Sequence, residues 1–236
     1  MLKKSLLVTA VLGAIAVPGV ALAQDEAALP IAGNLTFTTD YVFRGISQSD
    51  EDFAVQGGFD YAHEATGLYL GTWASNIDFA TDGTVELDLY GGWAKSFGDF
   101  GVKVGFVHYE YPGVSAFNTD EILVGGSWKW LSANVYYTYS DESFGVTDAK
   151  GTIYAELNAS YTLPVGLILG AHYGTTMFDG QSGGVANDTL DYDDYKISVG
   201  YSYGGFDFGL AYIDNDIDNP SAIAEDRVVF NVTKLF

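Results

Sequence analysis

The fold class is decided by the stretch YKISVGYSYGGFDFGLAY, residues 195–212. Aromatic and aliphatic side chains take every second position on both sides of Gly204-Gly205, while Lys196, Ser198 and Asp207 take positions between them. Alternation with a period of two indicates β-strands, and two such runs joined by a Gly-Gly pair indicate a hairpin. The stretch therefore predicts two antiparallel strands with one apolar face and one polar face.

The same alternation recurs along the chain, and from Gly33 onward we count twelve such segments. The links between them are alternately long, as at 45–52, and short, as at 63–66, 96–99, 129–131, 163–165 and 204–205. Short periplasmic turns opposite long external loops are typical of even-stranded outer-membrane barrels. The sequence thus predicts an all-β, transmembrane, antiparallel up-and-down barrel of about twelve strands over 33–236. A soluble sandwich, which also alternates, is the alternative.

The composition excludes several classes of protein. The 236 residues include 10 Lys and Arg against 31 Asp and Glu, for a formal net charge of −21. So acidic a chain repels polyanions, and we expect no nucleic-acid partner. The absence of cysteine from the sequence excludes a disulfide framework and a cysteine nucleophile. An apolar fraction of 48% is too high for a disordered acidic chain.

The first residues have the pattern of an export signal. Lys3 and Lys4 precede the apolar stretch 6–17, and Ala21-Leu22-Ala23 fits the small-x-small cleavage rule. We expect a signal peptide over 1–23, then a short periplasmic segment over 24–32. A transmembrane anchor over 5–23 is the alternative, but Pro18-Gly19 favours cleavage. Export and a barrel together predict the outer membrane of a Gram-negative bacterium, in contact with its lipid and lipopolysaccharide.

The last strand and the strand ends carry further membrane signals. The chain ends on phenylalanine, and the residues that share its face look like the terminal strand recognised by the barrel-assembly machinery: Val228, Phe230, Val232 and Phe236. Lys234 departs from the usual apolar residue at its position. Aromatic residues near strand ends, including Tyr41, Phe43, Trp93 and Trp128, predict interfacial girdles. The high β-propensity of aromatic residues in any sheet is the alternative explanation.

Residues 34–49, NLTFTTDYVFRGISQS, contain the pattern Asp-Tyr-x-Phe-Arg-Gly-x-Ser-Gln. This stretch resembles the N-terminal signature of the proteobacterial TorF family of porin-like proteins. Residues 108–113, HYEYPG, and the terminal strand are similar to that family as well. The resemblance covers the whole mature chain and implies a porin-like barrel. It supplies no established substrate and no catalytic residues.

Successive side chains of a strand point to opposite faces, and this alternation, here called parity, assigns charged side chains to the polar face. In a barrel the polar face lines the lumen. These residues are Asp40, Arg44, Asp60, Glu86, Asp88, Lys103, Glu156, Lys196 and Asp207. Six acids against three bases predict a pore that passes small hydrophilic solutes and ions and prefers cations. Inward glycines such as Gly92 and Gly105 are expected to leave space for it. The alternative is a non-conducting structural or adhesive barrel.

Arg44 is the strongest single candidate for a functional residue of the lumen, because the inward parity of the first strand continues to it. It is expected to pair with Asp40 or with a neighbouring lumen acid and to shape a constriction. The alternative is an ion pair with a purely structural role.

Catalysis has little support in the sequence. Of the three histidines, His172 has no obvious serine and acid partner, and no G-x-S-x-G motif occurs. We therefore expect no enzyme and no cofactor. An outer-membrane lipid hydrolase is the remaining alternative, because twelve-stranded barrels of that class exist.

One loop partly matches a calcium-binding spacing. Asp214, Asp216 and Asp218 alternate, and Glu225 falls at the twelfth position. Asn219 replaces the glycine that such a loop requires, and the segment joins strands rather than helices. A metal site of these four residues is thus one hypothesis, and a solvated acidic loop is the other.

Overall fold

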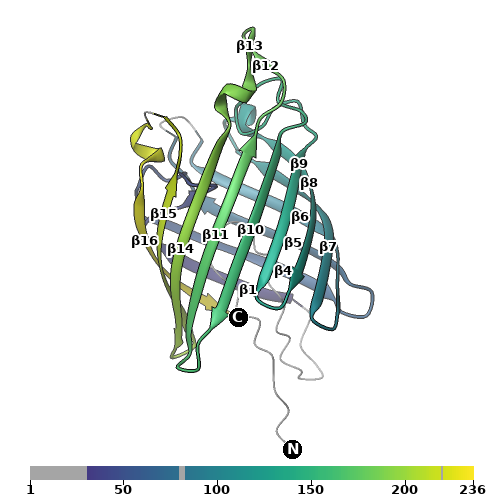
Figure 1. Ribbon diagram of the computed structural model, residues 1–236, viewed down its shortest axis with the longest axis vertical. Coiled ribbons are helices and arrows are strands. Elements are labelled where there is room, and N and C mark those ends of the chain that lie inside the picture. Colours follow the sequence, from purple (N-terminus) through teal and green to yellow (C-terminus); the bar gives the residue numbers. More distant parts are fainter. Residues whose placement is uncertain (1–30, 80–82, 219) are drawn as a thin grey trace, which may run out of the picture.

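The computed structural model describes residues 31–79, 83–218 and 220–236. In this part of the chain twelve antiparallel strands form a closed barrel (Figure 1). Each strand pairs with its neighbours in sequence, and β1 pairs with β16 to close the sheet, with Phe37 opposite Val232. The prediction of a twelve-stranded barrel is confirmed, and a sandwich is excluded because two separate sheets would leave open edges. The strands are β1 (Ile31–Thr38), β4 (Ala54–His63), β5 (Leu68–Asn76), β6 (Val85–Phe97), β7 (Phe100–Glu110), β8 (Thr119–Trp128), β9 (Leu131–Thr138), β10 (Ile153–Thr162), β11 (Leu167–Met177), β14 (Tyr192–Tyr203), β15 (Phe206–Asn215) and β16 (Arg227–Leu235).

The barrel has two different ends. The C-terminus and the short turns lie at one end, here the turn end, and the long connections lie at the other, here the loop end (Figure 1). β1 begins at Ile31, which is opposite Tyr61 of β4, so the barrel starts two residues before the predicted Gly33. The signal peptide over 1–23 and most of the segment over 24–32 lie outside the described residues.

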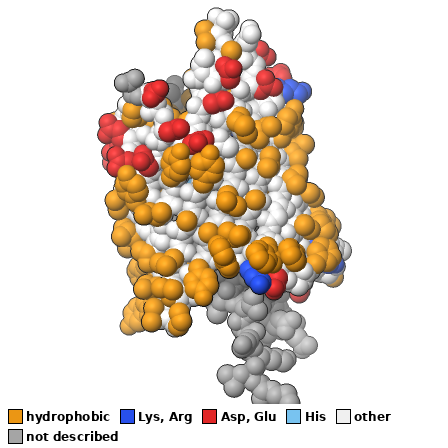
Figure 2. Space-filling model, viewed as in Figure 1, with side chains coloured by type: hydrophobic (Ala, Val, Ile, Leu, Met, Phe, Trp, Pro, Cys, Tyr) orange, Lys and Arg blue, Asp and Glu red, His pale blue; other side chains and the backbone are white. Residues whose placement is uncertain are grey.

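The two faces of the sheet differ in polarity as the alternation predicts. On β14 the side chains of Tyr195, Ile197 and Val199 point outward and are 41%, 64% and 36% exposed. Most of the buried polar side chains, in contrast, belong to the inward positions of the strands. On β5 the sequence allows either Leu68 and Leu70 or Tyr69 and Trp73 to face outward, and in the structure Leu68 and Leu70 do so. Apolar side chains therefore cover the outer wall (Figure 2).

Charge is distributed unevenly between the two ends. Figure 2 shows acidic side chains gathered toward the loop end. They come from the long connections and strand ends, and include Asp188, Asp191, Asp193, Asp214, Asp216, Asp218, Glu225 and Asp226. Lys95, Lys129 and Lys234 lie instead at or next to the short turns and the C-terminus.

The connections at the loop end contain two small hairpins and three short 3-10 helices. The hairpins are β2 (Val42–Phe43) with β3 (Ile46–Ser47), and β12 (Gln181–Ser182) with β13 (Val185–Ala186). The helices are η1 (Ser115–Phe117), η2 (Asn187–Leu190) and η3 (Ala222–Ala224). No helix among the described residues is long and apolar enough to cross a membrane.

Candidate functional site

The first long connection folds into the lumen, where the hairpin β2/β3, residues 42–47, forms what we name the inner hairpin. Arg44 and Gly45 form its tip, with φ values of +46° and +79°. Two successive residues with positive φ between paired strands are typical of a type I′ turn, whose twist matches that of a hairpin. The prediction that residues 45–52 form an external loop is therefore wrong for the hairpin, because the side chains of Phe43 and Arg44 are buried against Tyr109 and Glu121 of the barrel wall.

The base of the inner hairpin is anchored by the carboxylate of Asp40. The hydroxyls of Ser47 and Ser49 donate hydrogen bonds of 2.7 Å and 2.9 Å to its Oδ1 atom. The guanidinium of Arg227 on β16 donates to its Oδ2 atom at 2.8 Å. Asp40 therefore pairs with Arg227 rather than with Arg44. All of these oxygen contacts tie the hairpin to the seam between β1 and β16.

The tip of the hairpin reaches the opposite wall. The Nη2 atom of Arg44 lies 2.9 Å and 2.7 Å from the two carboxylate oxygens of Glu121 on β8. The side chains are 4% and 0% exposed, so the ion pair is fully buried. The hydroxyl of Tyr109 donates to the same carboxylate at 3.0 Å. Of the two partners expected for Arg44, the neighbouring lumen acid is the one observed.

Aromatic rings enclose the guanidinium of Arg44. Its Cζ atom lies 4.1 Å from the ring centre of Tyr154 and 5.3 Å from those of Tyr136 and Phe144. Burial by itself would lower the pKa of Arg44, but the charge and hydrogen bonding of Glu121, together with Tyr109 and Tyr154, raise that pKa above its usual value. Arg44 therefore remains a cation, stabilised by one carboxylate and several ring faces.

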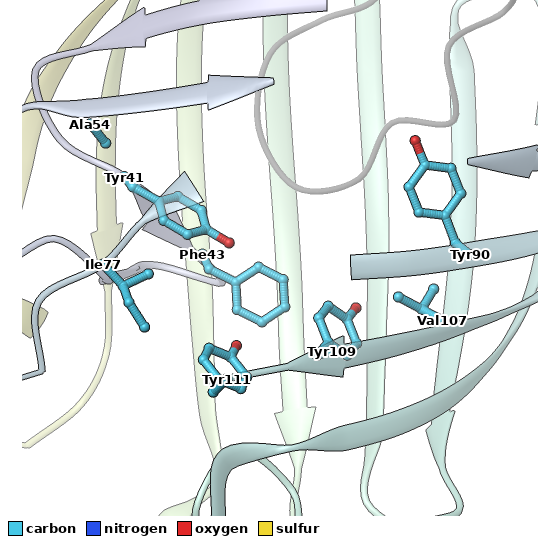
Figure 3. Packing of buried hydrophobic residues seen from close by; sticks show 8 residues of the cluster. All are labelled: Tyr41, Phe43, Ala54, Ile77, Tyr90, Val107, Tyr109 and Tyr111. Carbon is cyan, nitrogen blue, oxygen red and sulfur yellow. The ribbon is translucent and has the colours of Figure 1, made fainter. Parts of the chain in front are cut away.

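Phe43 of the inner hairpin belongs to a cluster of buried hydrophobic side chains (Figure 3), made of Tyr41, Phe43, Ala54, Ile77, Tyr90, Val107, Tyr109 and Tyr111. The prediction that Tyr41 and Phe43 belong to an outward girdle is wrong, because their exposed fractions are 7% and 8%. β1 ends at Thr38, and the chain then turns inward, so the parity of the strand no longer applies.

Carboxylates of the lumen lie against this cluster. Glu86 and Asp88 of β6 are 1% and 2% exposed, and the hydroxyl of Tyr41 donates to Glu86 at 3.0 Å. Burial, together with the nearby Glu86, raises the pKa of the Tyr41 hydroxyl well above its usual value, which keeps it a donor. Asp60 accepts a hydrogen bond of 2.6 Å from Tyr90. Tyrosine hydroxyls thus donate hydrogen bonds to two of the acids on this wall, Glu86 and Asp60.

The wall formed by β9, β10, β11 and β14 is more polar than the wall that carries the hydrophobic cluster. His172 lies 2.8 Å from Asp194 and 2.7 Å from Asn158, and Tyr154 donates to Asp194 at 3.0 Å. Glu156 accepts from Asn134 on this wall. His172 therefore does have an acid partner, which the sequence reading missed. Its described hydrogen-bond partners are Asn158, Tyr154 and Asp194, so the contacts supply no serine nucleophile.

Long side chains cover several of the inward glycines. A Cβ atom on Gly92 would lie 2.8 Å from the hydroxyl of Tyr69, and one on Gly105 would also meet that hydroxyl. A Cβ atom on Gly125 would lie 2.7 Å from Cε of Lys103. The expectation that these glycines leave open space is wrong, because the side chains of Tyr69 and Lys103 occupy it.

The remaining predicted residues lie away from the inner hairpin. Lys196 is opposite His172 on the neighbouring strand, and Asp207 accepts from Ser202 near the turn end. The outward side chains of Val228 and Phe230 are 64% and 44% exposed. Val232 is opposite Phe37, and the backbone N–H of Phe236 donates to Gly33 at 2.8 Å. These contacts place the terminal strand at the seam of the barrel.

In the part of the chain that the structure describes, the predicted calcium-binding residues are not grouped as metal ligands. Asp216 accepts a hydrogen bond of 2.7 Å from the backbone N–H of Asp193, and Asp226 accepts from Tyr212 at 3.1 Å. Within residues 31–79, 83–218 and 220–236, no group of three or more His, Asp or Glu side chains is placed to hold a metal ion. The acidic residues Asp214, Asp218 and Glu225 belong to the charged surface of the loop end.

The sequence reading also missed lumen residues that parity could have found. Ile122 and Val124 face outward on β8, so Glu121 must face inward. The same rule places Tyr136 and Tyr154 inside. Parity names such residues, but it does not say which of them the inner hairpin contacts.

Comparison with solved structures shows the same fold in the KdgM porin. The KdgM porin has a TM-score of 0.55 at 10% sequence identity, covering 87% of this chain and 98% of that chain. KdgM porin in complex with disordered oligogalacturonate has a TM-score of 0.51 at 10% identity, covering 87% and 97%. OccK9 (OpdG) of Pseudomonas aeruginosa has a TM-score of 0.40 at 13% identity, covering 78% and 54%.

No curated protein matches the sequence. A family described as "Bacterial protein of unknown function (Gcw_chp)" matches residues 23–236, which is nearly the whole chain. The TorF name is not part of that description. The chain therefore belongs to the Gcw_chp family of bacterial proteins.

Proposed function

We propose that this protein is a porin-like barrel of the outer membrane of a Gram-negative bacterium and passively conducts small hydrophilic solutes. The observation that carries the proposal is the reversal of polarity across one closed sheet. Exposed apolar side chains cover the outside, and buried polar and charged side chains line the inside. Only a closed barrel satisfies every backbone polar group of strands in lipid. The likeness to the KdgM porin fold supports the same conclusion.

We further propose that the pore prefers cations. Arg44 is paired with Glu121, and Arg227 with Asp40, so these charges cancel. The other lumen acids are Asp60, Glu86, Asp88, Glu156, Asp194 and Asp207, against the bases Lys103 and Lys196, with His172 beside Asp194. The acidic loop end adds to this excess. In a water-filled passage with low-dielectric walls, such an imbalance concentrates cations and repels anions.

The selectivity is tested by the reversal potential of the refolded protein in a planar bilayer under a KCl gradient. We expect a cation-selective potential that moves toward zero in the double variant Glu86→Gln/Asp88→Asn. The matched control Glu64→Gln/Asp99→Asn removes two carboxylates at the turn end and should leave the selectivity nearly unchanged. Anion preference, or equal behaviour of the two double variants, would contradict the assignment of Glu86 and Asp88.

The membrane location is tested by the two faces of β14. Val199→Arg should destabilise the barrel by about 2–4 kcal/mol in lipid, because Val199 faces outward near the middle of the strand. Ser198→Arg, on the inward face, should cost much less. The measurement is urea unfolding in lipid vesicles, followed by tryptophan fluorescence. A soluble monomer without detergent, or equal costs for the two variants, would contradict a membrane barrel.

Lipid and lipopolysaccharide around the wall, and the assembly machinery acting on the terminal strand, follow from the same proposal. The second candidate function is a non-conducting structural or adhesive barrel. The inner hairpin and its aromatic cluster favour it, because they occupy part of the lumen. Absence of conductance from a correctly refolded barrel that still shows the Val199→Arg effect would decide for this candidate.

A further inference from the structure

We infer that the inner hairpin is a latched constriction, and that the Arg44–Glu121 ion pair holds it across the lumen and so limits the size of solute that passes. This inference rests on the proposed conducting function. Arg44 and Glu121 become specificity-determining residues, a role different from that of the acids that attract cations.

The inner hairpin reaches across the lumen to three parts of the wall. Its base is bonded to Arg227 of β16 through Asp40. Its tip contacts Glu121 of β8 through Arg44, and the carbonyl of Gly45 accepts a hydrogen bond of 2.9 Å from Asn215 of β15. A segment held at these points lies in the path of a solute entering from the loop end.

The inner hairpin is not part of the barrel sheet. It forms its own two-stranded sheet with two residue pairs, Val42 with Ser47 and Phe43 with Ile46. So short a hairpin has little stability of its own. Its position therefore depends on the side-chain contacts at its base and tip, and not on a continuous ladder of backbone hydrogen bonds.

The ion pair at the tip is suited to act as a latch. A buried pair specifies one arrangement strongly, because removal of either partner leaves an uncompensated charge out of water. With Glu121 neutral, the cation of Arg44 would regain solvation by leaving its aromatic enclosure. Because Arg44 forms the tip, the whole hairpin would move away from β8 and widen the passage.

The first test compares Glu121→Gln with Asp99→Asn in single-channel recordings and in liposome swelling with sugars of increasing size. Both variants replace one carboxylate by an amide and break one ion pair, but the Lys129–Asp99 pair is exposed at the turn end. We expect Glu121→Gln to raise the unitary conductance on the order of twofold and to admit larger sugars. Asp99→Asn should behave like the parent protein. Equal conductance and size limits in all three proteins would overturn the inference.

The second test separates the position of the hairpin from the loss of charge. The chain has no cysteine, so the pair Gly45→Cys/Asn215→Cys can be added to Glu121→Gln without side reactions. A Cβ atom on Gly45 would lie 3.3 Å from Cβ of Asn215, close to disulfide range, and the strain that a side chain causes at Gly45 is common to the oxidised and reduced forms. Oxidation should restore the parent conductance and size limit, and reduction should abolish that restoration. The same conductance in the oxidised and reduced forms would contradict the latch.

A third measurement does not depend on conduction. Amide hydrogen exchange over residues 42–48 should be about tenfold faster in Glu121→Gln than in the parent or in Asp99→Asn, because the hairpin opens more often. Unchanged exchange would overturn the latch even if the barrel conducts. Faster exchange in a barrel that never conducts would support the hairpin's dependence on Glu121, while the proposed function and the size limit would both fail.

Discussion

The two small hairpins at the loop end have the same turn geometry and opposite locations. The tip of β2/β3 has positive φ at Arg44 and Gly45, and the tip of β12/β13 has φ values of +60° at Gly183 and +85° at Gly184. The inner hairpin lies within the barrel, whereas β12/β13, here the outer hairpin, projects beyond the loop end (Figure 1). The turn type therefore determines the shape of a hairpin but not where it packs.

The side chains account for the difference. Phe43 and Arg44 of the inner hairpin are 8% and 6% exposed, whereas Val185 of the outer hairpin is 60% exposed. A Cβ atom on Gly45 would lie 2.8 Å from Cβ of Asp194, while Cβ atoms on Gly183 and Gly184 would meet nothing within 4 Å. The inner hairpin packs inward because Phe43 and Arg44 contact Tyr109 and Glu121 of the barrel wall. The outer hairpin has neither an aromatic side chain nor a cation and stays in water.

The largest expected effect comes from the tip of the inner hairpin. Arg44→Ala should destabilise the protein by about 3–5 kcal/mol, because it leaves Glu121 buried without its counter-charge. Val185→Ala in the outer hairpin should cost under about 0.5 kcal/mol, because Val185 is exposed. Urea unfolding in vesicles measures both. Similar costs at the two sites would show that the inner hairpin contributes no more to stability than the outer one.

A smaller effect is expected at the glycine in the second position of each tip, Gly45 and Gly184. Gly184→Ala should cost about 1–2 kcal/mol, because alanine is strained at positive φ. Gly45→Ala bears the same strain and also brings a methyl group against Asp194 and Asn215, so it should cost about 1–3 kcal/mol more. The difference between the two variants, measured by the same unfolding experiment, isolates the packing of the inner tip. A difference near zero would mean that this tip is loosely packed.

The smallest effect concerns one serine in each hairpin. Ser47→Ala should cost about 1–2 kcal/mol, because the buried Asp40 loses a donor and the N–H of Glu51 loses an acceptor. Ser182 is half-buried and donates to the carbonyl of Thr147 in a solvent-exposed hydrogen bond, so Ser182→Ala should cost under about 0.5 kcal/mol. If the two substitutions cost the same, water must replace the Ser47 contacts as easily as those of Ser182.

Much of the barrel could be predicted because its information is local. Within each strand successive side chains point to opposite faces, so Ile197 and Val199 identify the outward face of β14 without knowledge of any partner. The alternation of long and short links then gives an antiparallel order with two different ends. The alternation of side chains also identifies most of the inward acids. Applied to Ile122 and Val124 of β8, it would have identified Glu121 as well.

The lumen could not be predicted in the same way. The alternation of β1, continued past its end, predicts that Tyr41 and Phe43 face outward and that Arg44 faces inward. β1 ends at Thr38, however, and the residues that follow adopt the geometry of a turn. Arg44 does reach the lumen, by way of the inner hairpin rather than as part of a strand. The expectation of open space at the inward glycines is wrong for a related reason. A glycine on one strand makes room for an aromatic ring or a long side chain from another strand.

The sequence by itself determined the strands, most of their faces, the number of strands and the acidic surplus, because each depends on spacing along a strand or on composition. Only the tertiary structure decided that Arg44 meets Glu121, which is 77 residues away, and that Asp40 meets Arg227, which is 187 residues away. Closing the barrel brings these strands around one lumen, and the inward turn after Thr38 selects which of them the hairpin contacts. The physical reason is that a buried charge must find its counter-charge in space, and no local periodicity records where that partner will lie.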